Sequence, residues 1–223
     1  MAFDYQPLIL SLELAFITTA LLLIIGIPLS AVLAMRKFRG KAVLETLISL
    51  PLVLPPSVLG FYLLIAFSPG NAFGGFLQSF FNLRLVFSFP GLVVGSMIYS
   101  LPFMVHPLQA GLQSLPPSLK EASYTLGKTR LQTLFGVLLP NIKPALITGI
   151  VLSFAHTIGE FGVVLMIGGN IQGKTRVASI AVYDQVESLH YHQAHVYSLI
   201  LLLLSFFILL LVYGINKRYL NPV

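Results

Sequence analysis

The stretch LPPSLKEASYTLGKTRLQTLFGVLLP, residues 115–140, is the longest polar interruption between the apolar segments of this chain. Two prolines end the apolar run that precedes it. Ser118, followed three residues later by Glu121, matches a capping box, so a short helix is predicted to begin at Leu119. Gly127 is placed to end that helix in a left-handed turn.

A second helix is predicted after this glycine. Its apolar residues recur at helical spacing and therefore share one face: Leu131, Leu134, Phe135, Leu138 and Leu139. Pro140 is expected to end it. Two helices joined at a glycine corner would form a rigid knob against a membrane surface.

The composition of the whole chain excludes a soluble globular domain. Of its 223 residues, 57% are hydrophobic and 9% charged, and the mean hydropathy is +0.91. Without cysteine it can form neither a disulfide framework nor a thiolate metal site. The net charge of +6 comes from basic residues at the ends of apolar runs, which indicates membrane lipid rather than nucleic acid as the partner. No room is left for a separate catalytic domain.

Five apolar segments reach the roughly 20 residues that a membrane-crossing helix needs. The predicted spans are residues 8–35, 44–67, 90–112, 144–167 and 196–215. Pro51, Pro55 and Pro56 should break or kink the second span, which then either lines a pathway or packs as a simple kink. Residues 68–89 are expected to hold a short interfacial helix, and residues 168–195 to form a loop.

The distribution of basic residues predicts the orientation. Ten of the 13 Lys and Arg residues lie in three segments, residues 36–43, 113–143 and 216–223, and the other three lie on the opposite side. The positive-inside rule therefore places residues 113–143 and the C-terminus in the cytoplasm and the N-terminus outside.

Residues 168–175, GGNIQGKT, match the Walker A pattern of nucleotide-binding loops. That loop needs a preceding strand and an α/β core, which this chain is not expected to have, and the charge count puts residues 168–175 outside the cell. A glycine-rich turn is predicted instead, with Lys174 and Arg176 available to an external partner.

Two further groups of polar residues invite a chemical interpretation. The cluster His190, His192 and His195 could bind zinc, but with no cysteine and only Glu187 nearby it is predicted to be a solvated loop, with no metal site. Glu160 is different, because it lies inside the fourth span.

A carboxylate at such a position costs about 2.5–3.5 kcal/mol on insertion scales and usually faces a cavity or a partner. Gly159 and Gly162 flank Glu160 and permit close helix approach. Its role is either structural, capping backbone amides or pairing with His156, or that of a gate or pathway residue.

The run Glu121-Ala122-Ser123, then three residues, Gly127, nine residues and Val137-Leu138-Leu139-Pro140, resembles the EAA motif of ABC-importer permeases. That motif usually reads E-A-A-x3-G-x9-I-x-L-P, so Ser123 replaces Ala and Val137 replaces Ile. In the family this loop is a cytoplasmic coupling helix that docks into a cleft of the ATPase. The resemblance therefore implies coupling residues at Ser118, Glu121, Ala122, Ser123, Gly127, Leu139 and Pro140.

Three more stretches resemble permeases of molybdate ABC importers: residues 50–64, 156–171 and 173–183. The resemblance implies an all-α integral membrane protein with the type I ABC importer permease fold, one transmembrane domain over residues 1–223. It also implies a homodimer in the bacterial inner membrane with two ATPase subunits and a periplasmic molybdate-binding protein. ATP and Mg would bind in the ATPase, and this chain would bind no cofactor and carry no catalytic residue. The alternatives are a permease for tungstate or for sulfate or thiosulfate, and a small intramembrane enzyme that uses Glu160.

A transported dianion should be carried by hydrogen-bond donors rather than by a tight charge clamp, because a strong site would prevent release. The candidates are the polar residues inside spans together with the flanking motif: Ser57, Ser96, Tyr99, Ser100, Ser153, Thr157, Gly159, Glu160 and Gly162. Each hydroxyl has an alternative use, since it can bond a carbonyl of its own helix.

Overall fold

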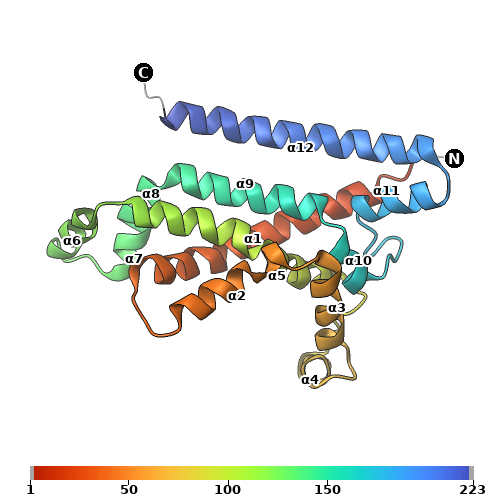
Figure 1. Ribbon diagram of the computed structural model, residues 1–223, viewed down its shortest axis with the longest axis horizontal. Coiled ribbons are helices and arrows are strands. Elements are labelled where there is room, and N and C mark those ends of the chain that lie inside the picture. The colour runs from red at the N-terminus through yellow and green to blue at the C-terminus, as the bar shows by residue number, and fades with distance from the viewer. Residues whose placement is uncertain (1–2, 221–223) are drawn as a thin grey trace.

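The computed structural model describes residues 3–220, and for residues 211–213 and 215–220 it describes the backbone alone. Every regular element in this part of the chain is a helix. Four long helices run along the long axis of the molecule (Figure 1): α1 (Gln6–Met35), α5 (Phe89–Ser114), α9 (Lys143–Gly159) and α12 (Tyr191–Leu220). Helices α1, α5 and α9 contact one another, and α12 contacts α9.

The largest apolar core joins this bundle to residues 115–140, which contain the EAA-like motif and are called the coupling stretch below. Leu22 of α1 and Met104 and Leu108 of α5 belong to the same buried cluster as Leu138, which precedes α8 (Leu139–Asn141), and Ile142, which caps the start of α9. Burial of apolar surface therefore holds the coupling stretch against the bundle. In Figure 1 the coupling stretch, with α6 (Pro117–Thr125), α7 (Arg130–Thr133) and α8, lies at one end of the long axis and the N-terminus at the other.

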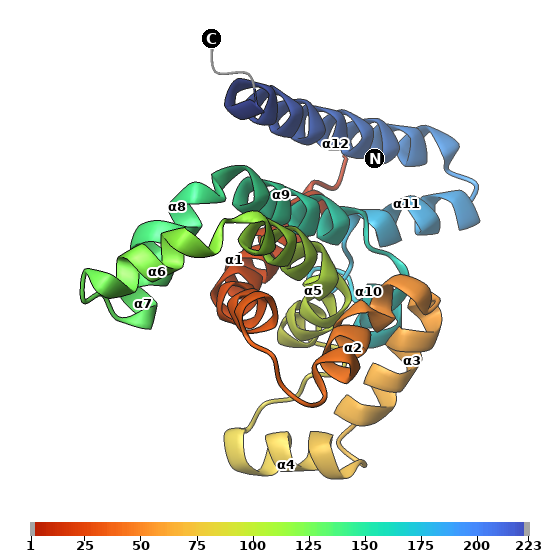
Figure 2. The same cartoon turned by 60° about the vertical axis from the view of Figure 1, so that its left-hand side comes forward.

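The predicted break in the second span is present. Helix α2 (Lys41–Val53) and helix α3 (Pro56–Phe67) meet at an angle of 116°. Pro55 and Pro56 cannot donate backbone hydrogen bonds, so the α-helix cannot run through them. The short helix predicted in residues 68–89 is α4 (Ala72–Phe81), which projects from the bundle beyond α3 (Figure 2).

The fourth span is not one continuous helix, as residues 144–167 were predicted to be. Helix α9 ends at Gly159, and α10 (Gly162–Gly168) begins after Glu160 and Phe161. At Gly162 the chain passes so close to α3 that an added Cβ would lie 2.6 Å from the Cβ of Pro56. The break lets α10 turn away from the axis of α9 and pack against α3.

The prediction of a simple loop over residues 168–195 is also wrong. It contains α11 (Ala178–Glu187), and Val177, Ala178 and Ile180 are fully or almost fully buried. The backbone N–H of Ala178 donates to Ser11 Oγ of α1 at 2.7 Å. The apolar spacing at 177, 178, 180 and 181 was the available signal for this helix.

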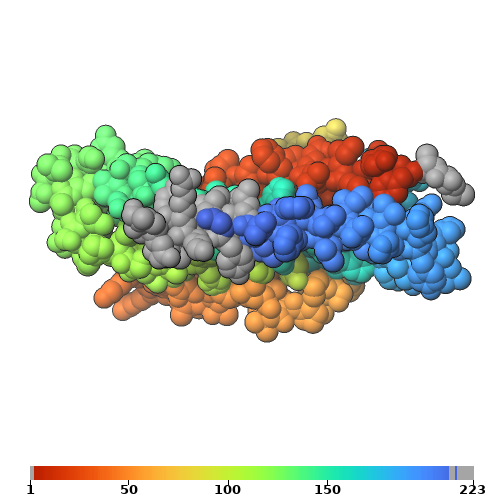
Figure 3. Space-filling model, turned by 90° about the horizontal axis from the view of Figure 1, so that it is seen from above, coloured from red at the N-terminus to blue at the C-terminus, as the bar shows by residue number. Residues whose placement is uncertain are grey.

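Among the described residues, three helices are long and apolar enough to cross a membrane: α1, α5 and residues 191–210 of α12. The number rises to five if residues 41–67 and residues 130–159, two bent pairs of helices, each form one span. The five-span topology stays a prediction. Seen from above, the blue N-terminal part of α12 lies across the face of the molecule in Figure 3, and the green coupling stretch lies at one end.

Candidate functional site

The coupling stretch begins with α6 (Pro117–Thr125), which starts two residues earlier than predicted. Pro116 is the N-cap, and Ser118 makes no capping bond, so the predicted capping box at Ser118 is wrong. The fixed φ of proline suits the first helical position, so the helix can begin at Pro117 without a side-chain cap. The capping box lies further on, where Thr129 and Gln132 bond each other's backbone N–H groups at 3.3 and 2.9 Å.

The glycine corner is confirmed. Gly127 has φ +75°, in the left-handed region. Its N–H donates to the carbonyl of Tyr124 at 2.9 Å, and the N–H of Lys128 donates to the carbonyl of Ser123 at 3.2 Å. These bonds satisfy carbonyls at the end of α6 and turn the chain back toward the bundle.

A hydrogen bond of Ser123 links the two arms of this corner, which are α6 before Gly127 and the helical segment from α7 to α8 after it. Its hydroxyl lies 2.9 Å from Thr133 Oγ1 on α7 (Arg130–Thr133), and both residues are buried, at 3% and 1% exposure. The residue that departs from the usual motif therefore has a structural use in this chain.

The second arm differs from a plain α-helix. After α7 comes a π-helical turn, η1 (Leu134–Leu138), and then α8 (Leu139–Asn141), so the arm ends at Asn141 rather than at Pro140. Pro140 has no N–H to donate, and the wider π-helical turn before it accommodates the missing hydrogen bond. The predicted apolar face is only partly confirmed, because Leu134, Leu138 and Leu139 are buried while Leu131 and Phe135 are exposed.

One surface of α6 is left free. Glu121 and Ala122 are exposed, and so is Leu126, at 78%. These three side chains leave this surface accessible to another protein.

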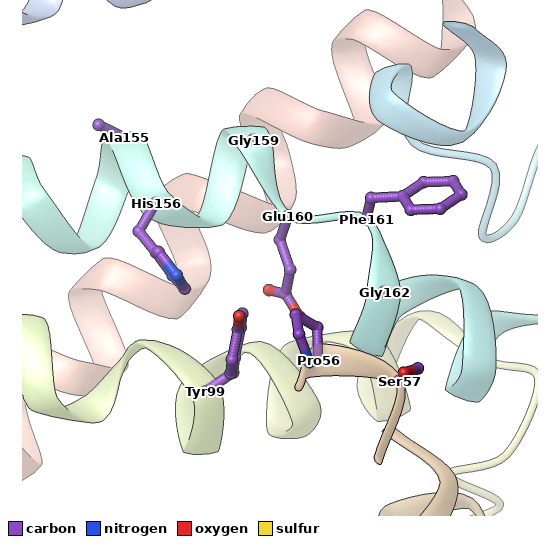
Figure 4. A pocket seen from close by; sticks show the side chains of 9 residues that line it. All are labelled: Pro56, Ser57, Tyr99, Ala155, His156, Gly159, Glu160, Phe161 and Gly162. Carbon is purple, nitrogen blue, oxygen red and sulfur yellow. The ribbon is translucent and has the colours of Figure 1, made fainter. Parts of the chain in front are cut away.

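A pocket of about 610 Å³ lies where α9 breaks, between the start of α3 and the middle of α5 (Figure 4). Its lining residues are Pro56, Ser57, Tyr99, Ala155, His156, Gly159, Glu160, Phe161 and Gly162. The pocket thus brings residues of α3 and α5 next to the break between α9 and α10, which is far from them in the sequence. Helix α9 connects it directly to the coupling stretch at Ile142.

Glu160 is 4% exposed, and neither carboxylate oxygen has a hydrogen-bond partner among the described residues. In Figure 4 its side chain points with Tyr99 into the same space. Pairing with His156, one of the alternatives for Glu160, does not occur: His156 Nδ1 lies 2.9 Å from Ser100 Oγ, and its ring stacks on Phe103 at 4.1 Å between centroids. Nor does the carboxylate cap backbone amides. The backbone carbonyl of Glu160 accepts from Ser179 Oγ of α11 at 2.5 Å.

The predicted pathway residues divide into two groups. Those that line the pocket are Ser57, Tyr99, Gly159, Glu160 and Gly162. Those that do not are Ser96, Ser100, Ser153 and Thr157, which are buried between α5 and α9. Thr157 donates to its own helix at the carbonyl of Ser153, as the alternative interpretation expected, and lies 3.0 Å from Ser100. His156, in the motif that contains Glu160, also lines the pocket and was not among the predicted pathway residues.

The Walker-like loop is closed on itself. Thr175 Oγ1 is buried, donates to the carbonyl of Gly168 at 2.7 Å and accepts from the N–H of Ile171 at 2.9 Å. The helix α10 precedes it, where a nucleotide-binding loop would follow a strand. The Thr175 hydroxyl therefore makes its hydrogen bonds to the backbone of the loop itself.

Arg176 is not available to an external partner, contrary to the prediction. It forms an ion pair with Asp184 at 2.5 Å and donates from Nε to Asn170 at 3.0 Å. Asn170 donates in turn to both carboxylate oxygens of Asp184. Lys174 is exposed. Within the described residues no three His, Asp or Glu side chains are grouped as metal ligands would be, and this includes the three histidines near the start of α12.

A bundle of apolar helices with a projecting, capped knob and a pocket at a helix break is the architecture of a membrane transport subunit. The chain belongs to the family of binding-protein-dependent transport system inner membrane components, whose profile matches residues 26–222. It is a multi-pass membrane permease and not an enzyme. The importer-permease family expected from the EAA-like motif is confirmed.

Among its curated relatives is the molybdenum transport system permease protein ModB of Azotobacter vinelandii, 45% identical over 97% of this chain and 95% of that protein. ModB of Escherichia coli K12 is 34% identical over 83% of this chain and 81% of its own length. The sulfate transport system permease protein CysT of Salmonella typhimurium is 36% identical over 91% of this chain and 72% of its own length.

Solved structures share the fold at low sequence identity. A chain of the inward-facing MetNI methionine ABC transporter matches with a TM-score of 0.70 at 16% identity, over 95% of this chain and 94% of that chain. A chain of a bacterial ABC transporter that imports alginate matches with a TM-score of 0.73 at 17% identity, over 96% and 80%. The all-α importer-permease fold is thereby confirmed.

Proposed function

We propose that this chain is the membrane subunit of an ATP-driven importer that carries molybdate into the cell. The observation that carries the proposal is its 45% identity, nearly end to end, with a molybdenum transport permease. Tungstate shares the tetrahedral dianion chemistry of molybdate. Sulfate or thiosulfate is a second candidate cargo, supported by the 36% identity with a sulfate permease over 91% of this chain.

The proposed complex contains two copies of this chain, two ATPase subunits and a periplasmic substrate-binding protein. ATP and Mg bind in the ATPase subunits. The exposed face of α6, with Glu121, Ala122 and Leu126, docks on the ATPase, and the N-terminus and residues 168–176 face the periplasm. The family, the basic charge distribution and the position of the coupling stretch opposite the N-terminus support this arrangement.

The structure supports a direct mechanical route from the motor to the pathway. Helix α9 has 17 residues, about 25 Å at helical rise, and runs from the coupling arm at Ile142 to the pocket at Glu160. Closure of the ATPase dimer would displace α6, and the buried core around Leu138 and Ile142 would pass the displacement into α9. The break at Glu160 would then open or close the pocket.

The pocket offers neutral donors to a dianion. The hydroxyls of Ser57 and Tyr99 and the ring of His156 lie in its wall, together with apolar atoms. Such donors bind a tetrahedral oxyanion without holding it tightly. The carboxylate of Glu160 repels an anion when it is charged, so we assign it to a gate rather than to a binding site.

The test is uptake of labelled molybdate into proteoliposomes that contain this chain, its ATPase and the binding protein, with competition by tungstate and by sulfate. Concentrative, ATP-dependent uptake supports the proposal, and stronger competition by sulfate than by tungstate would reassign the cargo. Because the chain has no cysteine, single engineered cysteines test the orientation separately. Ser118→Cys should be labelled from the cytoplasm alone and Lys174→Cys from the periplasm alone.

A further inference from the structure

A second pocket, of about 330 Å³, lies between the last turns of α1 and the coupling stretch. Figure 1 shows α7 next to the C-terminal end of α1. The pocket wall is largely apolar: Pro28, Ala31, Val32, Met35, Leu131 and Leu134. Its polar lining comes from Arg36, Lys120, Arg130 and Tyr124, and it contains no carboxylate.

The three basic side chains form no ion pair with any described carboxylate. Two ion pairs occur among the described side chains, Lys41–Glu45 and Arg176–Asp184, and neither involves them. Lys120 Nζ lies 5.9 Å from the centroid of the Tyr124 ring, a cation–π contact that leaves its charge uncompensated. Three uncompensated cations from three separate segments, α1, α6 and α7, converge on one concave site. Their mutual repulsion would be relieved by a bound anion.

The apolar wall shows what kind of anion fits. Ile24 is 69% exposed, and Pro28 and Val32 follow it at intervals of one helical turn, so an exposed apolar stripe on α1 continues directly into the pocket. The pocket therefore joins a membrane-facing surface to a basic rim at the end of the span. A free inorganic anion would use the rim and leave the wall exposed, whereas a lipid would cover both.

We propose that this pocket binds an anionic phospholipid, with its phosphate among Arg36, Lys120 and Arg130 and an acyl chain along α1. The lipid joins the end of the first span to both arms of the glycine corner. It thereby ties the position of the coupling stretch to the inner leaflet of the membrane. The inference depends on the membrane orientation and not on the identity of the cargo.

The test uses the complex of this chain with its ATPase in nanodiscs of phosphatidylcholine with added phosphatidylglycerol. Native mass spectrometry measures the affinity for phosphatidylglycerol. The pocket variant is Lys120→Gln with Arg130→Gln. The control is Lys37→Gln with Arg39→Gln, which removes two charges from the same basic face but outside the pocket.

Each lost charge-assisted bond to the lipid phosphate should weaken the affinity about fivefold, so the pocket variant should lose about 30-fold. The control should lose only a small part of that, because Lys37 and Arg39 do not line the pocket and make no bond to this phosphate. Arg130→Lys keeps the charge and should retain binding, which distinguishes lost affinity from misfolding. Millimolar inorganic phosphate should fail to displace the lipid.

Equal losses in the pocket and control variants would overturn the proposal, as would the absence of retained phosphatidylglycerol in the unaltered complex. Displacement by phosphate would also overturn it, because the pocket would then be a site for a free oxyanion. None of these measurements requires molybdate, so they stand apart from the uptake assay.

Discussion

Replacing Ser123 by alanine should loosen the glycine corner, although alanine is the usual residue at this place in the EAA motif. The change removes the 2.9 Å hydrogen bond to Thr133 and leaves the hydroxyl of Thr133, 1% exposed, without its partner. An unsatisfied buried hydroxyl costs about 1–3 kcal/mol. Thr133 can turn toward a carbonyl of its own helix, which places the expected cost at the lower end.

The assay is hydrogen–deuterium exchange of α6 and α7 in the intact permease–ATPase complex. A loss of about 1 kcal/mol in local opening free energy speeds amide exchange about fivefold. The double variant Ser123→Ala/Thr133→Val should restore slow exchange, because replacing both partners by apolar groups leaves nothing unsatisfied. Ser118→Ala, on the exposed side of the same helix, is the control and should change nothing.

Two results would refute this reasoning. If Ser123→Ala exchanged at the rate of the unaltered protein, the hydrogen bond would have no role in holding the corner. If the double variant exchanged faster than Ser123→Ala alone, the two hydroxyls would act independently rather than as a pair.

Three further predictions concern the corner, the pocket and the outer loop. Gly127→Ala should destabilise the corner by about 1–2 kcal/mol because φ is +75°; no atom lies within 4 Å of the added Cβ, so backbone strain is the whole cost. Gly127→Asn should destabilise the corner less, and the ratio of ATP hydrolysed to substrate imported measures the effect of both. Gly162→Ala should lower uptake several-fold because the added methyl group pushes α10 away from α3. Gly159→Ala, with open space around the added methyl group, should leave uptake unchanged, and equal effects of the two variants would contradict the proposed packing. Arg176→Gln should lower the melting temperature of the complex by a few degrees, while Lys174→Gln should leave it unchanged and alter only binding-protein affinity in a pull-down.

Much of the fold was predictable because its causes are local in the chain. Apolar runs of bilayer length predict α1, α5 and α12 without reference to any neighbour. The break before Pro56 and the corner at Gly127 follow from the backbone of proline and glycine, and both are present. The EAA spacing predicted the importer-permease family, which the sequence profile confirms.

The elements that were missed depend on contacts between distant residues. The helix boundary at Glu160 exists because Gly162 passes against Pro56, more than 100 positions away in the chain. Helix α11 exists because its apolar side chains are buried and because Ser11 accepts the N–H of Ala178. Three of the residues that share the pocket with Glu160, namely Pro56, Ser57 and Tyr99, come from α3 and α5, and no pattern near residue 160 predicts them.

The amino-acid sequence by itself determined that this chain enters a membrane and that its polypeptide bends at Pro55–Pro56 and at Gly127. These properties follow from hydropathy, basic charge and the backbone limits of proline and glycine, all of which act over a few residues. Only the tertiary structure decided which polar groups stay unsatisfied, among them the carboxylate oxygens of Glu160, which have no hydrogen-bond partner, and the cations around Lys120, which have no carboxylate partner. Whether a polar group is satisfied depends on what the rest of the chain brings within hydrogen-bonding distance of it, and that distance is set by packing.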